Sequence, residues 1–461
     1  PEDSIQLRAY STLATGFRWR KNNLEIPGAT GPVYYALTPG IYTVEAMNFN
    51  CGALSQQVRL GAFERPRISL ATDSVEAKER TLLPKWLWNN KAPLAKGSVF
   101  VKDMASTPGG DAFMLTLASR KKGKYTQQVA RFFSDGVFRK ILAEAELEDA
   151  SDRFIAADNL GNFFITGNDR YLTKYRPDGR IAWQKAVQME KVTGIATDPL
   201  DFVITTGRYQ NDLVIEDERY PAAQRSSMYV AKHDPQGELV WVRTLAVDWF
   251  EYDFGNAVHT DCEGNVYVAG GFRTIANFGD GNILRTSLKG DSFFLAKYSP
   301  DGELIWTQRV DIDKNRIRTH DSHTDCEGST YLVLGTNVLI YDREGGLQWQ
   351  GSLETPDTPR SLRIAATTNG DIYVQGITQK SEVFIAKINK IKKQIILWQS
   401  KGGSGELGDL PAIAADAKGS VFFAANTGSR VPPGLAHEAD NKASVYIARY
   451  GPPQLENMNK T

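Results

Sequence analysis

The sequence predicts an all-β protein, made of a small N-terminal sandwich followed by a seven-bladed β-propeller. Three observations lead to this prediction. A strand-and-turn unit recurs along most of the chain, and each copy offers four short alternating strands separated by Gly, Asp and Pro turns. The composition of 40 glycines and 10% aromatic residues in 461 residues also suits a turn-rich β protein better than a helical one.

The repeat reads as a turn DxxG, a strand NxYVxG, a loop of variable length, a strand FxAKY, a turn xDG and a strand ELxW. Its first turn begins at Asp158, Asp198, Asp261, Asp325, Thr367 and Asp416, which lie 40 to 64 residues apart. The strands therefore keep their lengths while one loop varies. A tryptophan recurs in the last strand, at Trp183, Trp241, Trp306, Trp349 and Trp398. Its constant register favours a packing wedge between blades over a platform for a ligand.

The ends of the repeat region complete the count of blades. Upstream of Asp158, residues 109–142 supply one degenerate unit, and the last unit stops after its third strand, SVYIARYGPP. An open blade edge would expose unpaired backbone groups, so a propeller needs closure. Residues 83–91, LPKWLWNNK, have the pattern of the missing strand, and we expect them to pair with residues 445–450. The propeller then covers residues 83–452, and residues 453–461 form a tail.

Residues 1–62 do not fit the blade pattern. Their strands alternate around NN and PG turns, which predicts a small β-sandwich, and residues 63–82 read as a linker of mixed charge. The stretches FRWRKNN, IPGAT and GIYTVEAMNFNCG resemble a bacterial extracellular Ig-like domain, in which Trp19 and Tyr42 would be core residues. The resemblance implies that Cys51 pairs with a cysteine at or just before Pro1. The alternative, a buried free thiol, stays open.

The propeller repeat resembles the SBBP-type seven-bladed repeat of secreted bacterial proteins. The resemblance implies export to the surface of a bacterium, where some such proteins are cargo of the type IX secretion system. Pro1 in place of an initiator Met indicates a leader that has been removed, and the C-terminal stretch YGPPQLENMNKT lacks the usual sorting domain of that cargo. Surface attachment would then need a partner protein or a lipid upstream of Pro1.

Composition excludes several classes of partner. Lysine plus arginine and aspartate plus glutamate both number 54, so no global field recruits nucleic acid or an anionic membrane. No apolar run approaches the roughly 20 residues of a transmembrane helix. The expected partner is an outer-membrane or cell-surface protein, or a glycan.

The cysteines and histidines give no strong sign of a metal site or a cofactor, and we expect neither. The set Cys51, Cys262 and Cys326 is odd and sparse, without zinc spacing. Cys262 and Cys326 occupy matching places in neighbouring blades, where side chains should point in parallel directions, so no disulfide is expected between them. His259 and His323 recur with the repeat in the motif HTD, which favours a structural role on inner strands.

Enzymatic interpretations find less support. Quinoprotein dehydrogenases also end their blades in a DGxxxW-like strand, but those usually have eight blades and often a vicinal cysteine pair. No Ser-His-Asp, Cys-His or paired-carboxylate constellation rises above the background of a chain rich in Asp and Glu.

The candidate binding surface follows from blade geometry. The two short turns of a blade leave the sheet at one end, so the long insertions share the opposite face. Aromatic residues interleaved with Arg and Asp on that face can anchor a protein or a sugar. The candidates are Arg208, Tyr209, Trp249, Tyr252, Arg273, Phe278, Arg318 and His320. The alternative is that Trp249, Phe250 and Phe278 plug their own loops.

These observations predict a non-catalytic binding or scaffold protein of the bacterial cell surface, with the propeller as an interaction platform and a place in an outer-membrane assembly. The alternative function is that of a propeller protein that binds or cleaves polysaccharide.

Overall fold

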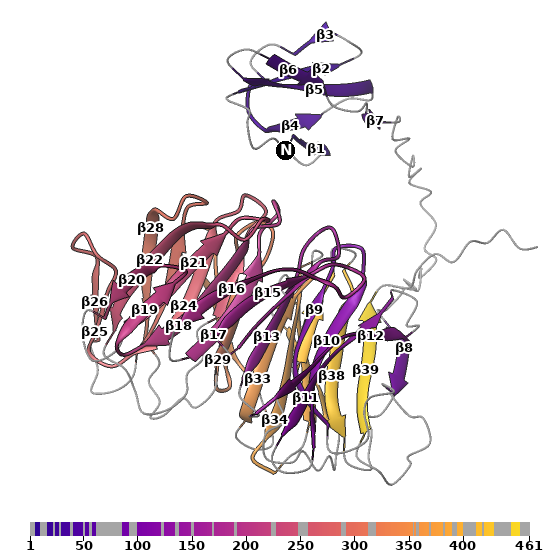
Figure 1. Ribbon diagram of the computed structural model, residues 1–461, viewed down its shortest axis with the longest axis vertical. Helices are drawn as coiled ribbons and strands as arrows, with labels where there is room; N and C mark the ends of the chain where they lie inside the picture. The colour runs from indigo at the N-terminus through magenta and orange to yellow at the C-terminus, as the bar shows by residue number, and fades with distance from the viewer. Residues whose placement is uncertain are drawn as a thin grey trace, which may run out of the picture. The chain divides into compact units, whose positions relative to one another are not determined.

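The computed structural model divides the chain into two compact units, Pro1–Arg80 and Thr81–Thr461, and every regular element in the described residues is a β-strand (Figure 1). No helix in these ranges has the length and hydropathy needed to span a bilayer. The structure describes residues 5–9, 16–21, 24–26, 29–36, 40–48, 51–54, 58–60, 85–91, 99–120, 124–133, 138–148, 152–167, 170–188, 191–222, 227–247, 257–286, 292–311, 320–353, 355, 359–367, 370–380, 383–389, 394–399, 412–416, 419–427 and 444–451.

The first unit contains two sheets around one core. One sheet pairs β1 (Ile5–Arg8) with β4 (Val33–Ala36); the other has the order β3 (Leu24–Glu25), β2 (Gly16–Lys21), β5 (Gly40–Asn48) and β6 (Cys51–Leu54), and β7 (Val58–Leu60) also pairs with β5. Trp19 and Tyr42 are 3% and 1% exposed in this core. The indole Nε1 of Trp19 donates to the carbonyl of Gly31 at 2.9 Å, which satisfies its polar atom.

The second unit is a seven-bladed β-propeller of antiparallel sheets. The first strands of the blades contact one another in the cyclic order β9, β13, β17, β23, β29, β33, β37 and back to β9, which closes the ring. Blade 1 consists of β9 (Val99–Ser106), β10 (Ala112–Ser119), β11 (Tyr125–Phe132) and β12 (Phe138–Leu147), and blade 2 of β13 (Arg153–Ala157), β14 (Phe163–Gly167), β15 (Tyr171–Tyr175) and β16 (Ile181–Gln188). Blade 3 consists of β17 (Lys191–Thr197), β18 (Val203–Tyr209), β21 (Ser227–His233) and β22 (Leu239–Val247), blade 4 of β23 (Ala257–Thr260), β24 (Val266–Phe272), β27 (Ser292–Tyr298) and β28 (Leu304–Val310), and blade 5 of β29 (His320–Thr324), β30 (Thr330–Leu334), β31 (Asn337–Tyr341) and β32 (Leu347–Ser352). Blade 6 consists of β33 (Pro359–Ala366), β34 (Asp371–Thr378), β35 (Val383–Asn389) and β36 (Gln394–Gln399), and blade 7 of β37 (Ala412–Ala415), β38 (Val421–Thr427), β39 (Ser444–Gly451) and β8 (Lys85–Lys91).

The seventh blade combines both ends of the propeller sequence. Strand β8 precedes the first blade in the chain and pairs antiparallel with β39, with Trp86 opposite Tyr450 and Trp88 opposite Arg449. A hydrogen bond of 2.6 Å from Ser106 Oγ to the carbonyl of Ala415 joins the first strands of blades 1 and 7. The backbone groups of β39 thus have partners on both sides.

Two insertions form additional hairpins, which the sequence did not predict. The hairpin of β19 (Asp212–Ile215) and β20 (Glu218–Pro221) comes from blade 3 but pairs with β16 of blade 2. Likewise β25 (Ile275–Asn277) and β26 (Ile283–Arg285) come from blade 4 and extend β22 of blade 3. Each hairpin therefore joins two neighbouring blades and makes a sheet of six strands.

Each blade has a face of turns and a face of loops. The first turn joins its first and second strands, and the second turn joins its third and fourth; in an antiparallel sheet both leave at the same end. We call this end the turn face and the opposite end the loop face. Hairpins β19–β20 and β25–β26 pair with the last residues of β16 and β22, which places them toward the loop face.

A buried ion pair explains why an acidic and a basic residue recur at fixed places in the repeat. In blade 3, Asp198 of the first turn lies 2.9 Å from Lys232 of the third strand, and both side chains are buried. Asp198 Oδ1 also accepts two turn amides, from Leu200 and Phe202. The same pair recurs as Asp158–Lys174, Asp261–Lys297 and, with an arginine, Asp416–Arg449. In blades 1 and 6 the first turn begins with a threonine, and the paired carboxylate lies four residues later, in Asp111–Arg131 and Asp371–Lys387. The Lys of FxAKY thus neutralises the carboxylate that shapes the turn.

The repeated Trp connects blades 2, 3 and 4 each to the following blade. Trp241 Nε1 donates to the carbonyl of Pro300 in the second turn of blade 4, at 3.0 Å. Gly302 of that turn, at φ +82°, lies so close that a Cβ would be 2.7 Å from the indole ring. Trp183 and Trp306 repeat this contact with the carbonyls of Pro235 and Arg343. The predicted role of Trp as a wedge between blades is confirmed at these three positions.

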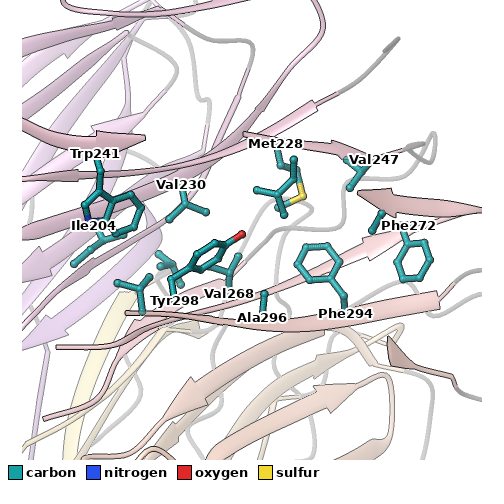
Figure 2. Close-up of a cluster of buried hydrophobic side chains, with 14 residues drawn as sticks. Ile204, Met228, Val230, Trp241, Val247, Val268, Phe272, Phe294, Ala296 and Tyr298 are labelled. Carbon is teal, nitrogen blue, oxygen red and sulfur yellow. The ribbon is translucent and has the colours of Figure 1, made fainter. Parts of the chain in front are cut away.

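Apolar layers fill the space between neighbouring blades. Figure 2 shows the layer between blades 3 and 4, where Met228 and Val230 face Phe294 and Tyr298, with Trp241 at one end. These side chains are at most 7% exposed. The core of the propeller is therefore a ring of such layers. The first strands of the blades lie inside this ring and line its axis.

Candidate functional site: the central channel and the loop face

A channel of about 500 Å³ runs between the first strands of all seven blades. The lining includes β9, β13, β17, β23, β29, β33 and β37. Two residues before the first turn, five of these strands carry alanine, and β23 and β29 carry His259 and His323. Small side chains keep the channel open at this level, and blades 4 and 5 place an imidazole there.

His259 and His323 face each other with ring centroids 5.1 Å apart. Burial lowers the pKa of His259 to about 3, with a further contribution from His323, and burial lowers the pKa of His323 to about 4. Both imidazoles are therefore neutral near pH 7. Nε2 of His259 has no hydrogen-bond partner among the described residues. Within the same residues, no group of three or more His, Cys, Asp or Glu side chains is arranged to hold a metal ion.

Two aspartates and an arginine, Asp103, Asp321 and Arg363, are among the charged residues that line the channel. Asp103 Oδ2 accepts the amide of Ile155 at 2.9 Å, and Asp321 Oδ2 accepts the amide of Ile364 at 3.0 Å, so each carboxylate joins two neighbouring first strands. Burial raises the pKa of Asp103 to about 6, against an opposing effect of Arg363. Burial also raises the pKa of Asp321, again opposed by Arg363.

These groups suit the binding of water or a small polar solute, and they also hold the ring together. Hydroxyl groups next to the turns add to the second role. Thr197 Oγ1 donates to the carbonyl of Ala157 and Thr260 Oγ1 to that of Thr197, both at 2.8 Å. The sequence pattern gave no sign of the Asp103, Asp321 and Arg363 set, because its members come from three separate blades and none belongs to the repeat motif.

The structure places the predicted binding residues in different environments. Tyr209 is 1% exposed and packs with Leu213 and Ile215, so its ring supports the β19–β20 hairpin from inside. Arg208, beside it at the end of β18, is half-buried, and Arg273 is exposed after β24. Trp249, Tyr252 and Arg318 lie outside the described residues.

Phe278 and His320 both make aromatic contacts with the core of blade 4. Phe278 meets Phe294 edge to face with centroids 5.1 Å apart, which agrees with the alternative that this ring plugs its own loop. His320 is 7% exposed and lies edge to face against Phe293, also at 5.1 Å. His320 is the first residue of β29 and lines the channel.

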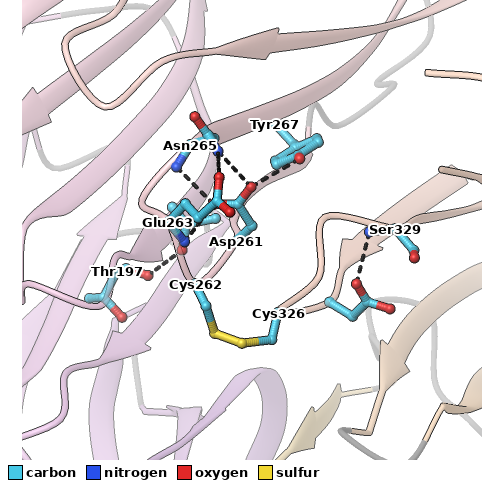
Figure 3. Close-up of a disulfide and its surroundings, with 10 residues drawn as sticks. Thr197, Asp261, Cys262, Glu263, Asn265, Tyr267, Cys326 and Ser329 are labelled. Atoms are coloured by element: carbon cyan, nitrogen blue, oxygen red, sulfur yellow. Dashed lines mark hydrogen bonds between the residues drawn. A yellow bond between two sulfur atoms is a disulfide. The ribbon is translucent and has the colours of Figure 1, made fainter. Parts of the chain in front are cut away.

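The expectation that Cys262 and Cys326 do not pair is wrong, because the structure joins them in a disulfide with their Cα atoms 4.6 Å apart (Figure 3). In blades 2 and 4 the second residue of the first turn contacts the first turn of the next blade. Cys262 N donates to the carbonyl of Cys326 at 3.1 Å. At the same place in blades 2 and 3, the side-chain amide of Asn159 donates to the carbonyl of Pro199. Matching positions near the axis thus converge.

We compared the sequence and the structure with those of known proteins. No protein-family model matches the sequence, and no curated protein matches it. A catalytically inactive virginiamycin B lyase from Staphylococcus aureus, crystallised with quinupristin, is similar in structure with 11% identity and a TM-score of 0.47, over 79% of this chain and 99% of that one. The WD40 domain of Pan2 from Neurospora crassa has 10% identity and a TM-score of 0.46, over 81% and 97%. A protein of unknown function from Bacteroides caccae has 12% identity and a TM-score of 0.36, over 59% and 89%. At these identities the likeness concerns the fold alone.

Proposed function

We propose that this protein is a non-catalytic binding protein of the bacterial cell surface, with the loop face of its propeller as an interaction platform in an outer-membrane assembly. The observation that carries the proposal is the construction of the two insertions. Each insertion is paired through its backbone with the preceding blade. The backbone of β20 and β26 is therefore held in place, which lowers the conformational entropy that a partner must remove on binding.

Export to the cell surface is supported by the disulfide. Structural disulfides persist in oxidising compartments and are rare in the reducing cytosol. The first unit adds support, because Trp19 and Tyr42 are buried between its two sheets, as an Ig-like domain of the extracellular type requires. We propose that residues 1–62 are such a domain and that the propeller is of the SBBP type.

The proposed contact surface consists of the exposed residues of the insertions. Arg219 on β20 has a side chain 71% exposed and pairs with Asp212 at 2.7 Å. Ile283 on β26 is 41% exposed. Arg273 lies on the same insertion as Ile283. An exposed aliphatic residue with arginines near it has the composition of a protein interface.

The test is capture of outer-membrane proteins with purified full-length protein, followed by mass spectrometry. The variant Arg219→Ala/Arg273→Ala/Ile283→Ser should lose the captured partner while its melting temperature stays unchanged. The control Arg180→Ala removes an exposed arginine from the turn face and should keep the partner. The same proteins are also tested on a glycan array. If the wild type binds a polysaccharide and the triple variant does not, the ligand of the loop face is a glycan and not a protein. A cytosolic location on cell fractionation would reject the proposal.

A further inference from the structure

Exposed apolar side chains gather on the turn face. Eight large hydrophobic residues are at least 41% exposed in the described part of the chain. Six of them belong to the turn ends of blades 2 to 5: Leu160, Ile181, Leu200, Val240, Ile305 and Leu347. Single exposed aliphatic residues are normal on a protein surface, but here six of the eight in the described residues lie at the turn ends of adjacent blades, which indicates a contact surface.

The position of these residues in the blades explains why they share a face. Leu160 and Leu200 are the third residues of the first turns of blades 2 and 3. The other four lie in the first two positions of the fourth strands, directly after the second turns. Both turns leave the sheet at the same end. The six side chains therefore form an arc over the turn face, which we call the aliphatic arc.

The same turns carry an excess of negative charge, although the whole chain has equal numbers of acidic and basic residues. Seven acidic residues of these turns are exposed, against three arginines, of which two belong to blade 2. The acidic residues are Asp178, Glu238, Glu263, Asp301, Glu303, Glu327 and Glu344, and the arginines are Arg176, Arg180 and Arg343. The charge of this surface is therefore local and negative, strongest over blades 3 to 5.

The turns are fixed to one another, so the surface is formed before any partner arrives. Arg343 of blade 5 lies 2.9 Å from Glu263 of blade 4. The disulfide joins the first turns of the same two blades (Figure 3). Asn159 of blade 2 bonds Asp201 of blade 3 through both its backbone and side-chain nitrogen. A rigid surface loses little conformational entropy on binding.

We propose that the turn face of blades 2 to 5 docks a basic amphipathic segment of another protein, with the aliphatic arc against its apolar side and the turn carboxylates around its lysines and arginines. Charge complementarity selects this occupant. An anionic membrane or a nucleic acid would be repelled by the same carboxylates. The surface lies on the opposite face of the propeller from the insertions and is independent of the function proposed for them.

The test uses the full-length protein and a synthetic helical peptide with lysines on one side and leucines on the other, measured by titration calorimetry. The variant Val240→Ser/Ile305→Ser removes apolar contact, and Asp301→Asn/Glu303→Gln/Glu327→Gln removes three charges. Each variant should bind the peptide roughly tenfold more weakly than the wild type, or weaker still. Higher salt should weaken binding to the wild type more than to the charge variant. Melting temperatures should stay unchanged, since all these side chains are exposed.

Two controls separate this surface from the loop face and from charge alone. Arg180→Ala should bind the peptide as tightly as the wild type or more tightly. Arg219→Ala/Arg273→Ala/Ile283→Ser should leave the affinity for the peptide unchanged. The proposal is overturned if neither turn-face variant weakens binding, or if polylysine without leucines binds as tightly as the amphipathic peptide. Loss of the peptide in the loop-face variant would also overturn it. Capture of the outer-membrane partner is a separate readout, so one proposal can fail while the other stands.

Discussion

His233 is an unusual residue in the repeat. It occupies the place of the tyrosine in FxAKY, is 0% exposed, and neither ring nitrogen has a hydrogen-bond partner among the described residues. Burial lowers its pKa to about 4, with a further contribution from the charge of Lys185. The unfolded chain therefore takes up a proton first, near pH 6.5, and folding stability falls as the pH drops from about 6.5 to about 4. His259 and His323 act in the same direction.

We predict that His233→Phe removes part of this pH dependence. Between pH 7 and pH 5 a histidine with this shift costs the native state about 2 kcal/mol, because the unfolded state gains most of the proton. Between pH 7 and pH 5 the free energy of unfolding should therefore fall by about 2 kcal/mol less in the variant than in the wild type. Denaturant titrations of both proteins at the two pH values measure it. Equal losses in wild type and variant would show that His233 carries no such penalty.

Elements differ in how far their sequence reveals them. The strands of the repeat were predictable because alternation and turn glycines are local signals. Strand β25 has three residues, Ile275–Asn277, and takes its stability from pairing with β22, so no local pattern marks it. The disulfide was missed for a related reason: the approach of two turns depends on the closed ring, which a linear spacing of 64 residues does not contain. The channel carboxylates are likewise brought together only by ring closure.

The contact of Trp241 with the next turn gives a prediction at this scale. Gly302 and Gly281 have nearly the same φ, +82° and +81°, but a Cβ at Gly281 would meet nothing within 4 Å. Gly281→Ala should therefore show the backbone cost alone, about 1 kcal/mol. Gly302→Ala must in addition displace the indole, and we expect a further loss of about 1 to 3 kcal/mol. Denaturant unfolding of the two variants measures the difference, and equal losses would mean that the Trp contact adds nothing.

At the scale of the whole molecule, the ring depends on contacts between blades that are far apart in sequence. Polar bonds near the axis and Trp contacts farther out join neighbouring blades, and hairpins β19–β20 and β25–β26 add backbone pairing between blades 2, 3 and 4. Blades 1 and 7 are joined by Ser106 and Ala415 near the axis. Strand β8 completes blade 7 from a segment of the chain that precedes blade 1. The ring should therefore unfold as one unit, with the seventh blade as the place where both chain ends contribute.

This arrangement predicts different outcomes for two deletions. Removal of residues 1–62 takes away strands β1 to β7, which pair only with one another in the described structure, and should leave the propeller with its melting temperature. Removal of residues 1–91 also takes away β8, so β39 loses its pairing along Tyr446 to Gly451 and exposes a free edge. Unpaired edge groups favour association with other chains, and the lost strand contacts lower stability. The longer deletion should thus lower the melting temperature and produce oligomers in size-exclusion chromatography. A monomeric 92–461 fragment that melts at the same temperature as 63–461 would show that β8 contributes nothing to the closure of the ring.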